Sequence, residues 1–435
     1  MSELGYARGN MHIQTMTDAI EYLDQFIQPP GGLGDGAYNF GRMQELMKHL
    51  GDPQKTLKVI HIAGTSGKGS TAVAISSLLH AHGFKVGLTV SPHMLDLRER
   101  TQIDNQIILE AKYCQNLVDM IPAIDAMKDS KYGSPSFFEI TMAHAFYTFQ
   151  KEKVDYAVVE TGMGGRYDAS NVVDRKDKLA LITRIGLDHT EFLGNTIAKI
   201  AEEKAHIIQK ENRVLSVPQE EEARNVILRV AQEYSASLKF IDVPTLVKTS
   251  LIGEYQKENI SLACAALYEL SKRDRFQYKS QIVNHTLQNL HVIGRFDIRE
   301  ISGKTVILDG AHNPQKMEAF ISSLTQKYPE KKFDFLVAFR KGKDFSEMLQ
   351  YIVTYANSIT ITEFALNDQG MHVTAEKVQD ISRVMKQLRI TNYECLRSTR
   401  KAFEHALKEA DNILVITGSL YLLSNLYSTI PELKE

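Results

Sequence analysis

One stretch of the chain decides the fold: Val59-Ile-His-Ile-Ala63-Gly64-Thr-Ser-Gly67-Lys68-Gly69-Ser70-Thr71. Its first five residues are mostly apolar and β-branched, which predicts a buried strand. From about Ser70 to Ala81 the pattern becomes helical, so the glycine-rich segment lies between a strand and the start of a helix. Backbone N–H groups in such a loop converge on an anion, and the helix dipole adds to the attraction. The stretch therefore predicts a phosphate-binding loop.

The side chains of this loop suit a nucleotide. Lys68 is placed to reach the β- and γ-phosphates, and Ser70 or Thr71 supplies a hydroxyl of the kind that binds the accompanying Mg²⁺. The loop departs from the common phosphate-loop pattern, since position 62 is Ile and Gly69 follows Lys68. The alternative is a strand–turn–helix corner whose glycines serve only the turn. A bare turn does not need Lys-Gly-Ser-Thr, so nucleotide binding is favoured.

Strand-like and helix-like patterns alternate along the rest of the chain. Strands are predicted at 85–90, 156–159 and 179–182, and in a second series at 305–308, 333–339, 358–364 and 413–416. Repeated strand–helix units predict an α/β protein with mainly parallel sheets. We predict a large N-terminal P-loop-type domain over residues 1–294 and a smaller Rossmann-like domain over residues 295–435.

Composition excludes several classes of protein. The chain has 435 residues, of which 43% are hydrophobic and 24% charged, so it is neither disordered nor fibrous. The 51 Lys and Arg against 53 Asp and Glu leave a net charge of −2, which provides no overall attraction for nucleic acid or an anionic membrane. The three cysteines are far apart and have no metal-like spacing. Signal-peptide and membrane-spanning patterns are also missing. We expect a cytoplasmic monomer.

Three strand ends carry groups that bind hard cations. Glu160 ends one predicted strand, Ser91 ends another, and His189 follows a third. If these strands are neighbours, a carboxylate, a hydroxyl and an imidazole converge beside the phosphate loop. Mg²⁺ accepts such oxygen ligands and keeps several waters. An imidazole ligand is unusual for Mg²⁺, and a lone histidine such as His189 is more often structural.

At this point the sequence resembles a known family. The segment from His61 to Ser70 is similar to the phosphate loop of the Mur ligase superfamily. Further segments resemble folylpolyglutamate synthase and dihydrofolate synthase: Ser91-Pro-His93, Glu160-Thr-Gly-Met-Gly-Gly-Arg-Tyr-Asp168-Ala-Ser-Asn171, Asp188-His189, Glu203-Lys204-Ala205, Gly294-Arg295-Phe296, Asp309-Gly-Ala-His-Asn-Pro314 and Thr417-Gly-Ser-Leu-Tyr421. These segments run in the family's order from about residue 38 to 424.

The resemblance implies an ATP-dependent ligase that activates a folate carboxylate as an acyl phosphate and joins L-glutamate to it. It implies ATP contacts from Gly64, Thr65, Gly67, Lys68, Gly69, Ser70, Thr71, Asn259, Arg295 and Asp309, and magnesium ligands at Ser70, Ser91, Glu160 and His189. Lys204 matches a lysine that the family carries as a carbamate. Together with Lys68 and Lys204, His312 is a candidate catalytic residue, on the glutamate side. The resemblance also leaves room for a monovalent cation.

For the folate, the resemblance implies a pterin pocket bounded by Phe40, Gly41, Phe138 and Asp168. Aromatic residues at helical spacing more often belong to the core than to a ligand site, so Phe138 has a structural alternative. The segment from Asp309 to Pro314 also has a structural interpretation, in which Asn313 caps a helix and Pro314 occupies the first position of that helix. Lys204, without the resemblance, is a solvated helix lysine.

The chain departs from the family pattern at several positions. They include Ser66 and Arg184 in place of Asn, Tyr255 in place of His, His206 in place of Gly and Ile293 in place of Pro. We predict a folylpolyglutamate synthase, which adds L-glutamate to the γ-carboxylate of a tetrahydrofolate. A bifunctional enzyme that also joins glutamate to 7,8-dihydropteroate is the nearest alternative. Another Mur-type ligase, or a nucleotide-binding protein without ligase activity, are the others.

Overall fold

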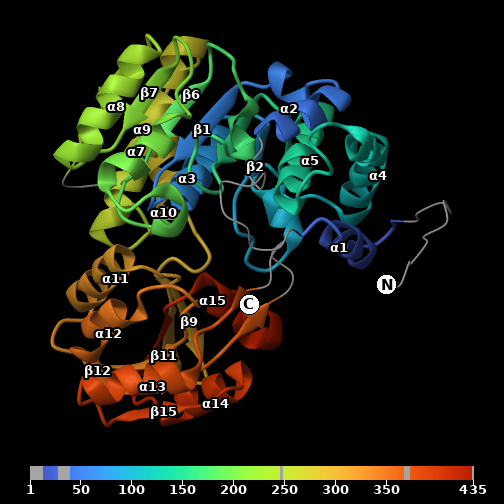
Figure 1. The fold of residues 1–435 in the computed structure, drawn as a ribbon. Helices are drawn as coiled ribbons and strands as arrows, with labels where there is room; N and C mark the ends of the chain where they lie inside the picture. The colour runs from blue at the N-terminus through green and yellow to red at the C-terminus, as the bar shows by residue number, and fades with distance from the viewer. Residues whose placement is uncertain (1–12, 28–39, 245–247, 367–372, 434–435) are drawn as a thin grey trace, which may run out of the picture.

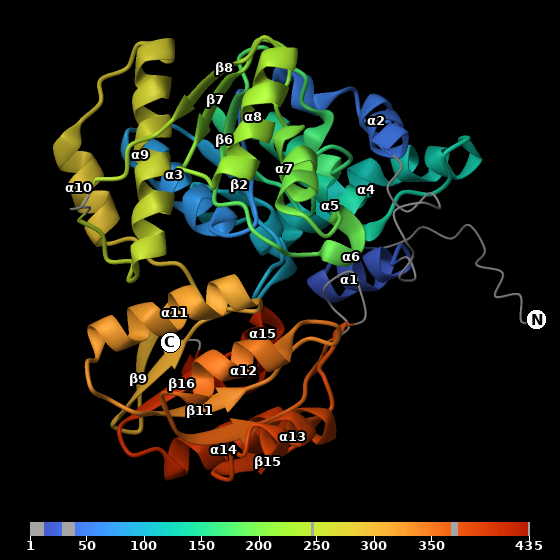
Figure 2. The same cartoon turned by 60° about the vertical axis from the view of Figure 1, so that its left-hand side comes forward.

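A computed structural model of the chain describes residues 13–27, 40–244, 248–366 and 373–433. The described residues form two lobes, each built around its own sheet (Figures 1 and 2). The α/β class predicted from the sequence is confirmed.

The N-terminal lobe contains an eight-stranded sheet in the order β4-β3-β2-β5-β1-β6-β7-β8. Its strands are β1 (Val59–Ala63), β2 (Val86–Thr89), β3 (Gln102–Ile103), β4 (Gln106–Ile107), β5 (Tyr156–Glu160), β6 (Leu179–Ile182), β7 (Arg213–Ser216) and β8 (Ser237–Phe240). Strand β1 lies between β5 and β6 and pairs in parallel with both. Strand β2 pairs in parallel with β5. The predicted strands are therefore neighbours, and the residues that follow them meet at one edge.

Helices cover both faces of this sheet. One face carries α3 (Lys68–Ala81), α9 (Glu254–Asp274) and α10 (Ser280–Gln288), which pack on Ile60 and Ile62 of β1. The opposite face carries α1 (Met16–Asp24), α2 (Phe40–His49), α4 (Glu110–Ala126), α5 (Phe137–Lys151), α7 (Ile197–Ala205) and α8 (Glu221–Glu233). A short helix, α6 (Thr190–Leu193), precedes α7. Strand β1 is thus buried on both faces, which explains why its sequence is almost continuously apolar.

The C-terminal lobe contains a six-stranded sheet in the order β15-β12-β11-β16-β10-β9. Its strands are β9 (Asp297–Ile301), β10 (Lys304–Leu308), β11 (Phe333–Val337), β12 (Ala356–Ile361), β15 (Tyr393–Cys395) and β16 (Ile413–Thr417). A small pair, β13 (Ala365–Leu366) and β14 (Val373–Thr374), lies apart from it. Within the six-stranded sheet, the strand pairs are parallel except β9 with β10, as expected for a Rossmann-like sheet with an antiparallel edge.

Five helices enclose the second sheet: α11 (Pro314–Lys327), α12 (Phe345–Val353), α13 (Val378–Gln387), α14 (Thr399–Glu409) and α15 (Leu420–Thr429). The first three pack on one face and the last two on the other. In both views, α11 lies on the side of this lobe that faces the N-terminal lobe (Figures 1 and 2). The chain passes between the sheets after α10 and before β9, and the domain division at residues 294 and 295 stays a prediction.

Among the described residues, the structure contains no helix that is both long and apolar enough to span a bilayer.

Candidate functional site

The glycine-rich loop follows β1 and leads into α3, as predicted. Gly67 is the N-cap of α3 and has a φ of 91°, a backbone conformation that favours glycine. A Cβ atom at Gly67 would also collide with the side-chain amide of Asn259, and one at Gly64 would collide with the Thr183 hydroxyl. The backbone of the loop is therefore packed directly against α9 and the end of β6.

Arg184, the residue after Thr183, also holds the phosphate loop in place through its backbone carbonyl group. The backbone N–H groups of Thr65 and Ser66 donate to the Arg184 carbonyl oxygen, at 2.9 and 3.1 Å. The Thr65 hydroxyl also lies 2.9 Å from the Gly186 carbonyl oxygen. The helix that follows begins at Lys68, and the N–H groups of its first turn have no partner within the helix. These groups are the ones available to a phosphate.

Lys68 points back over the loop, with its Nζ 3.1 Å from the Gly64 carbonyl oxygen. The Thr71 hydroxyl is buried and lies 3.4 Å from the backbone carbonyl of Asn259. Thr71 thereby ties α3 to α9, which favours Ser70 over Thr71 as a cation ligand.

Glu160 ends β5 beside the first turn of α3. Its Oε2 accepts a hydrogen bond from the Ser91 backbone N–H at 3.0 Å and lies 3.5 Å from the Cβ position of Gly69. Burial raises the pKa of Glu160, and the Lys68 charge opposes that rise. A cation next to this buried carboxylate would favour its ionised form, as expected at a cation site.

His189 follows β6, on the other side of β1 from Glu160. Burial lowers the pKa of His189 to about 3, so its imidazole is neutral near pH 7 and retains a lone pair. Within the described residues, no group of three or more His, Cys, Asp and Glu side chains could hold a metal alone. A cation here would depend on one carboxylate, hydroxyls, the imidazole and a nucleotide's phosphates, and all of these except the imidazole are typical donors of a magnesium–nucleotide site.

Lys204 lies near the end of α7 and is almost fully buried. Burial, together with the Lys68 charge, lowers its pKa from the ordinary 10.5 to about 7. The backbone of Gly165 approaches so closely that a Cβ there would lie 3.1 Å from the Lys204 Cα. The glycine-rich turn after Glu160 therefore packs directly on the helix that carries Lys204, which is not the solvated helix lysine of the alternative hypothesis.

Asp168 holds the turn that follows Glu160. Its carboxylate accepts hydrogen bonds from the Met163 and Ser170 N–H groups, both at 2.9 Å, and from the Ser170 hydroxyl at 2.5 Å. The Phe138 ring occupies the space that a Cβ of Gly162 would need. The predicted pterin contacts of Asp168 and Phe138 stay predictions, and so do those of Phe40 and Gly41, which begin α2.

In the C-terminal lobe, Asp309 follows β10 and is buried. Its carboxylate accepts from the backbone N–H groups of Phe296 and Ala311, both at 2.9 Å. Burial raises the pKa of Asp309 to about 6, and the Arg295 charge opposes the rise. Arg295 and Asp309 therefore lie close together. Asn313 caps α11 and Pro314 is its first residue, as the structural hypothesis predicted.

A cluster of charges that the sequence did not reveal joins the two lobes at Asp188. The Asp188 carboxylate contacts Asn313 Nδ2 at 3.0 Å, Lys316 Nζ at 3.3 Å and Lys343 Nζ at 2.6 Å, all from the C-terminal lobe. His312 Nε2 lies 3.9 Å from the same carboxylate. Burial opposes ionisation, but the charges of Lys316 and its neighbours hold the pKa of Asp188 well below its ordinary range. Asp188 directly precedes His189, so this cluster brings the C-terminal lobe against the candidate cation site.

We expect Asp188→Asn to weaken the contact between the lobes, because it leaves two buried ammonium groups without their carboxylate. The radius of gyration from small-angle X-ray scattering should increase, and the rate of ligation should fall. Asp177→Asn, which removes the Arg175–Asp177 pair within the N-terminal lobe, is the control and should change neither. An unchanged radius of gyration for Asp188→Asn would contradict the interpretation of this cluster as the tie between the lobes.

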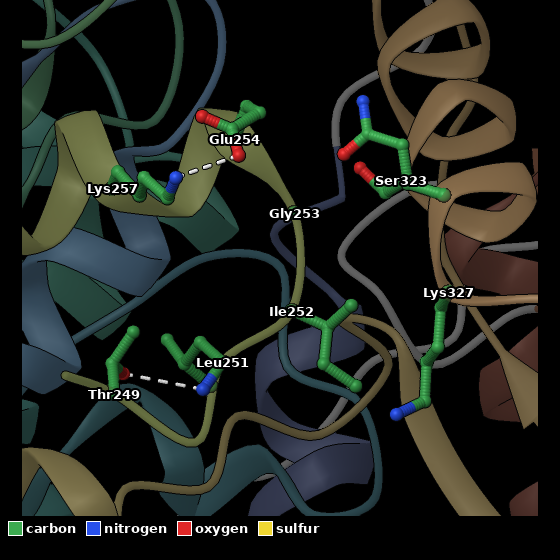
Figure 3. Close-up of a pocket in the computed structure, with 9 residues that line it drawn as sticks. Thr249, Leu251, Ile252, Gly253, Glu254, Lys257, Ser323 and Lys327 are labelled. Carbon is green, nitrogen blue, oxygen red and sulfur yellow. Dashed lines mark hydrogen bonds and ion pairs between the residues drawn. The ribbon is translucent and has the colours of Figure 1, made fainter. Parts of the chain in front are cut away.

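A separate cavity of about 270 Å³ lies between the two lobes, away from the Asp188 cluster (Figure 3). It is lined by residues before and within the first turns of α9 and by the end of α11: Thr249, Leu251, Ile252, Gly253, Glu254, Lys257, Ser323, Gln326 and Lys327. Lys257 and Glu254 pair across its wall at 2.7 Å. The residues that line it include none of the predicted nucleotide contacts.

Comparison with known protein families finds a match in each of the two lobes. Residues 62–240 match the family model described as the Mur ligase middle domain, and residues 295–429 match the one described as "Dihydrofolate synthetase, C-terminal domain". The dihydrofolate synthase/folylpolyglutamate synthase of Bacillus subtilis is 30% identical over 89% of this chain and 93% of its own length. The dihydrofolate synthetase of Saccharomyces cerevisiae is 30% identical over 88% of this chain and 96% of its own.

A solved structure also matches the chain along most of its length. Folylpolyglutamate synthase from Mycobacterium tuberculosis, solved in complex with ADP, superposes with a TM-score of 0.84 at 26% identity, over 95% of this chain and 98% of that one. The two family models together match residues in both lobes. From its sequence, its fold and the residues that surround the phosphate loop, the chain belongs to the folylpolyglutamate synthase and dihydrofolate synthase family of ATP-dependent, amide-forming Mur-type ligases.

Proposed function

We propose that this chain joins L-glutamate to the γ-carboxylate of a tetrahydrofolate through an acyl phosphate, with release of ADP and phosphate. The observation that carries the proposal is the convergence of the phosphate loop, the buried Glu160 and the Asp188 contact at one edge of the parallel sheet. That convergence supports phosphoryl transfer to a carboxylate followed by attack of an amine. We also propose that the protein acts on these small molecules as a cytoplasmic monomer.

Different residues of the chain would assist different steps of this reaction. The N–H groups at the start of α3 and the Lys68 ammonium neutralise the phosphates, so the carboxylate oxygen can approach the γ-phosphorus. The bond from that phosphorus to ADP breaks as the new oxygen–phosphorus bond forms. The amine of glutamate then attacks the acyl carbon, loses a proton, and phosphate leaves. Arg295 and Asp309 would contact the nucleotide from the C-terminal lobe.

Ser70, Ser91 and Glu160 would hold Mg²⁺ through oxygen atoms, the donors that this ion prefers, and His189 would add an imidazole, which is a less usual ligand for it. When bound, Mg²⁺ neutralises phosphate charge and makes the transferred phosphorus more electrophilic.

Glu160→Gln should raise the Mg²⁺ concentration needed for half-maximal activity, because it removes the one carboxylate of the predicted set. An increase of about tenfold or more is expected. Titration of activity with Mg²⁺ at fixed ATP measures it. The control is Glu152→Gln, a carboxylate directly after α5 that pairs with Lys85, before β2, and with Lys112 of α4. An identical Mg²⁺ dependence for Glu160→Gln and the unmodified enzyme would refute the metal role.

A second reaction, the joining of glutamate to 7,8-dihydropteroate, is favoured by one observation. The C-terminal lobe matches a domain model described as that of dihydrofolate synthetase, and the dihydrofolate synthetase of Saccharomyces cerevisiae matches over 88% of this chain. The sequence does not separate this reaction from the first, because both proceed through the same acyl phosphate.

Incorporation of labelled L-glutamate, with ATP and Mg²⁺, tests the proposal when tetrahydrofolate and dihydropteroate are compared as acceptors. Incorporation with tetrahydrofolate alone supports a folylpolyglutamate synthase, and incorporation with both supports a bifunctional enzyme. Incorporation with dihydropteroate alone would correct the proposal to a dihydrofolate synthase. Incorporation with neither would refute it, and ATP hydrolysis unaffected by either acceptor would indicate a nucleotide-binding protein without ligase activity.

A further inference from the structure

Lys316 is a lysine in an unusual position. It is the third residue of α11, a helix on the side of the C-terminal lobe that faces the N-terminal lobe (Figures 1 and 2). The first turn of a helix carries the positive end of the helix dipole, so a cation there is unfavourable. The Lys316 side chain is also only 20% exposed. Neither helix stability nor solvation accounts for a lysine at this position.

Two acceptors from different lobes hold the Lys316 ammonium. Its Nζ lies 2.9 Å from His312 Nε2 and 3.3 Å from Asp188 Oδ2. Burial lowers the pKa of His312 well below its ordinary value, so the ring is neutral. Because His312 Nδ1 lies 2.7 Å from the Gly310 carbonyl oxygen, Nδ1 carries the proton and Nε2 accepts from Lys316. Within the described part of the chain these acceptors use two of the three N–H groups, and one is left for a ligand.

Lys316 lies beside the phosphate loop. Its neighbour Gln315 accepts a hydrogen bond from the hydroxyl of Ser66, a loop residue, through its side-chain oxygen at 3.4 Å. In agreement with this geometry, the Lys316 charge adds to burial and the Lys68 charge in lowering the pKa of Lys204. Lys316 therefore approaches the loop from the opposite lobe to Lys68.

Lys343 provides a comparison. It contacts the other oxygen of Asp188 at 2.6 Å and is, like Lys316, mostly buried. Its charge affects Asp188 and the neighbouring His189 and His312. Lys343 thus shares the contact between the lobes with Lys316, but it lies in the loop after β11, whereas Lys316 follows Gln315, whose side chain contacts the phosphate loop at Ser66.

We propose that Lys316 is a further catalytic residue, whose remaining N–H donates to an oxygen of the phosphoryl group as it passes from ATP to the substrate carboxylate. The inference rests on the proposed function. In that step the bond between the γ-phosphorus and ADP breaks and the bond to the carboxylate oxygen forms. Lys316 keeps its proton throughout and stabilises negative charge on the transferred group. His312 then serves to position Lys316.

The oxygen that accepts from Lys316 could belong to the phosphoryl group or to a carboxylate of glutamate. One experiment distinguishes these two acceptors. ADP formation is followed in a single turnover with the folate or pteroate acceptor but without glutamate, and the KM for glutamate is measured in the steady state. Lys316→Met should slow ADP formation about a hundredfold and leave the KM for glutamate unchanged. Lys316→Arg should restore part of the rate, and Lys343→Met, which weakens only the contact between the lobes, should slow ADP formation far less than Lys316→Met does. Thermal unfolding confirms that each variant is folded.

Several outcomes would overturn the proposal. Normal ADP formation in Lys316→Met with a raised KM for glutamate would assign the lysine to the amino acid. Equal slowing in Lys316→Met and Lys343→Met would show that the lysines act through closure of the lobes and not through phosphoryl contact. If the unmodified enzyme formed no ADP with either acceptor, the proposed function would itself be wrong and this role would fall with it.

Discussion

Lys68→Ala is expected to reduce glutamate incorporation by about a hundredfold or more, the loss typical when one charge-stabilising donor is removed from a transferring group. Lys68 is the first residue of α3, and its Nζ donates a hydrogen bond to the Gly64 carbonyl oxygen at 3.1 Å, the one that it makes among the described residues. A single hydrogen bond of this kind contributes about 1 kcal/mol to folding, so the chain should stay folded. The loss of the ammonium should instead leave the charge of the β- and γ-phosphates without its counterion.

Steady-state kinetics and thermal unfolding measure the two effects separately. Lys408→Ala, which removes a side chain that is 83% exposed on α14, is the control and should match the unmodified protein in both. Lys68→Met keeps the length of the side chain and should be as inactive as Lys68→Ala. If either Lys68 variant kept full activity, the ammonium could not be a phosphate ligand.

The parts of the fold that the sequence predicted are those encoded by local pattern. The β-branched run at 59–63 and the glycines after it predicted a strand, a loop and a helix, and the structure has β1 and α3 there. The helix begins at Lys68, slightly before the predicted start, because Gly67 provides its N-cap. Convergence of Glu160 and Ser91 was predictable too, since the carboxyl ends of neighbouring parallel strands lie at one edge.

The cluster around Asp188 that joins the two lobes could not be predicted from local sequence pattern. Asp188 is separated from its partners Asn313 and Lys343 by 125 and 155 residues. No periodicity or spacing connects residues so distant, and Lys316 and Lys343 look like ordinary solvated lysines in the sequence. Their burial follows from how α11 and the loop after β11 meet the other lobe, which is decided by tertiary packing. Asp168 illustrates the same limit, since only the structure reveals its hydrogen bonds to Met163 and Ser170.

Lys204→Ala is expected to lose activity, and short carboxylic acids such as formate or acetate should restore part of it. Carbamate formation requires a neutral amine, whose nitrogen bonds to the carbon of CO₂ and releases a proton. Burial and the Lys68 charge lower the pKa of Lys204 to about 7, so about half of the amine is neutral at pH 7, against roughly one part in three thousand for an ordinary lysine. The protein thus favours the reactive form, and a free carboxylate can replace the anion that the modified lysine would carry.

Lys178 is a matched control, because it is also buried and its pKa is also lowered by burial to about 7. Its Nζ donates to the Val173 carbonyl oxygen at 2.8 Å, away from the phosphate loop, so it has a structural role. Lys178→Ala should lower the melting temperature, and carboxylic acids should restore nothing. Activity of Lys204→Ala that formate and acetate leave unchanged, together with electron density for a bare amine in a fully liganded crystal of the unmodified enzyme, would reject the carbamate. Rescue confined to Lys204→Ala would instead show that the chemistry at this position needs an anion, which an ammonium beside Lys68 cannot supply.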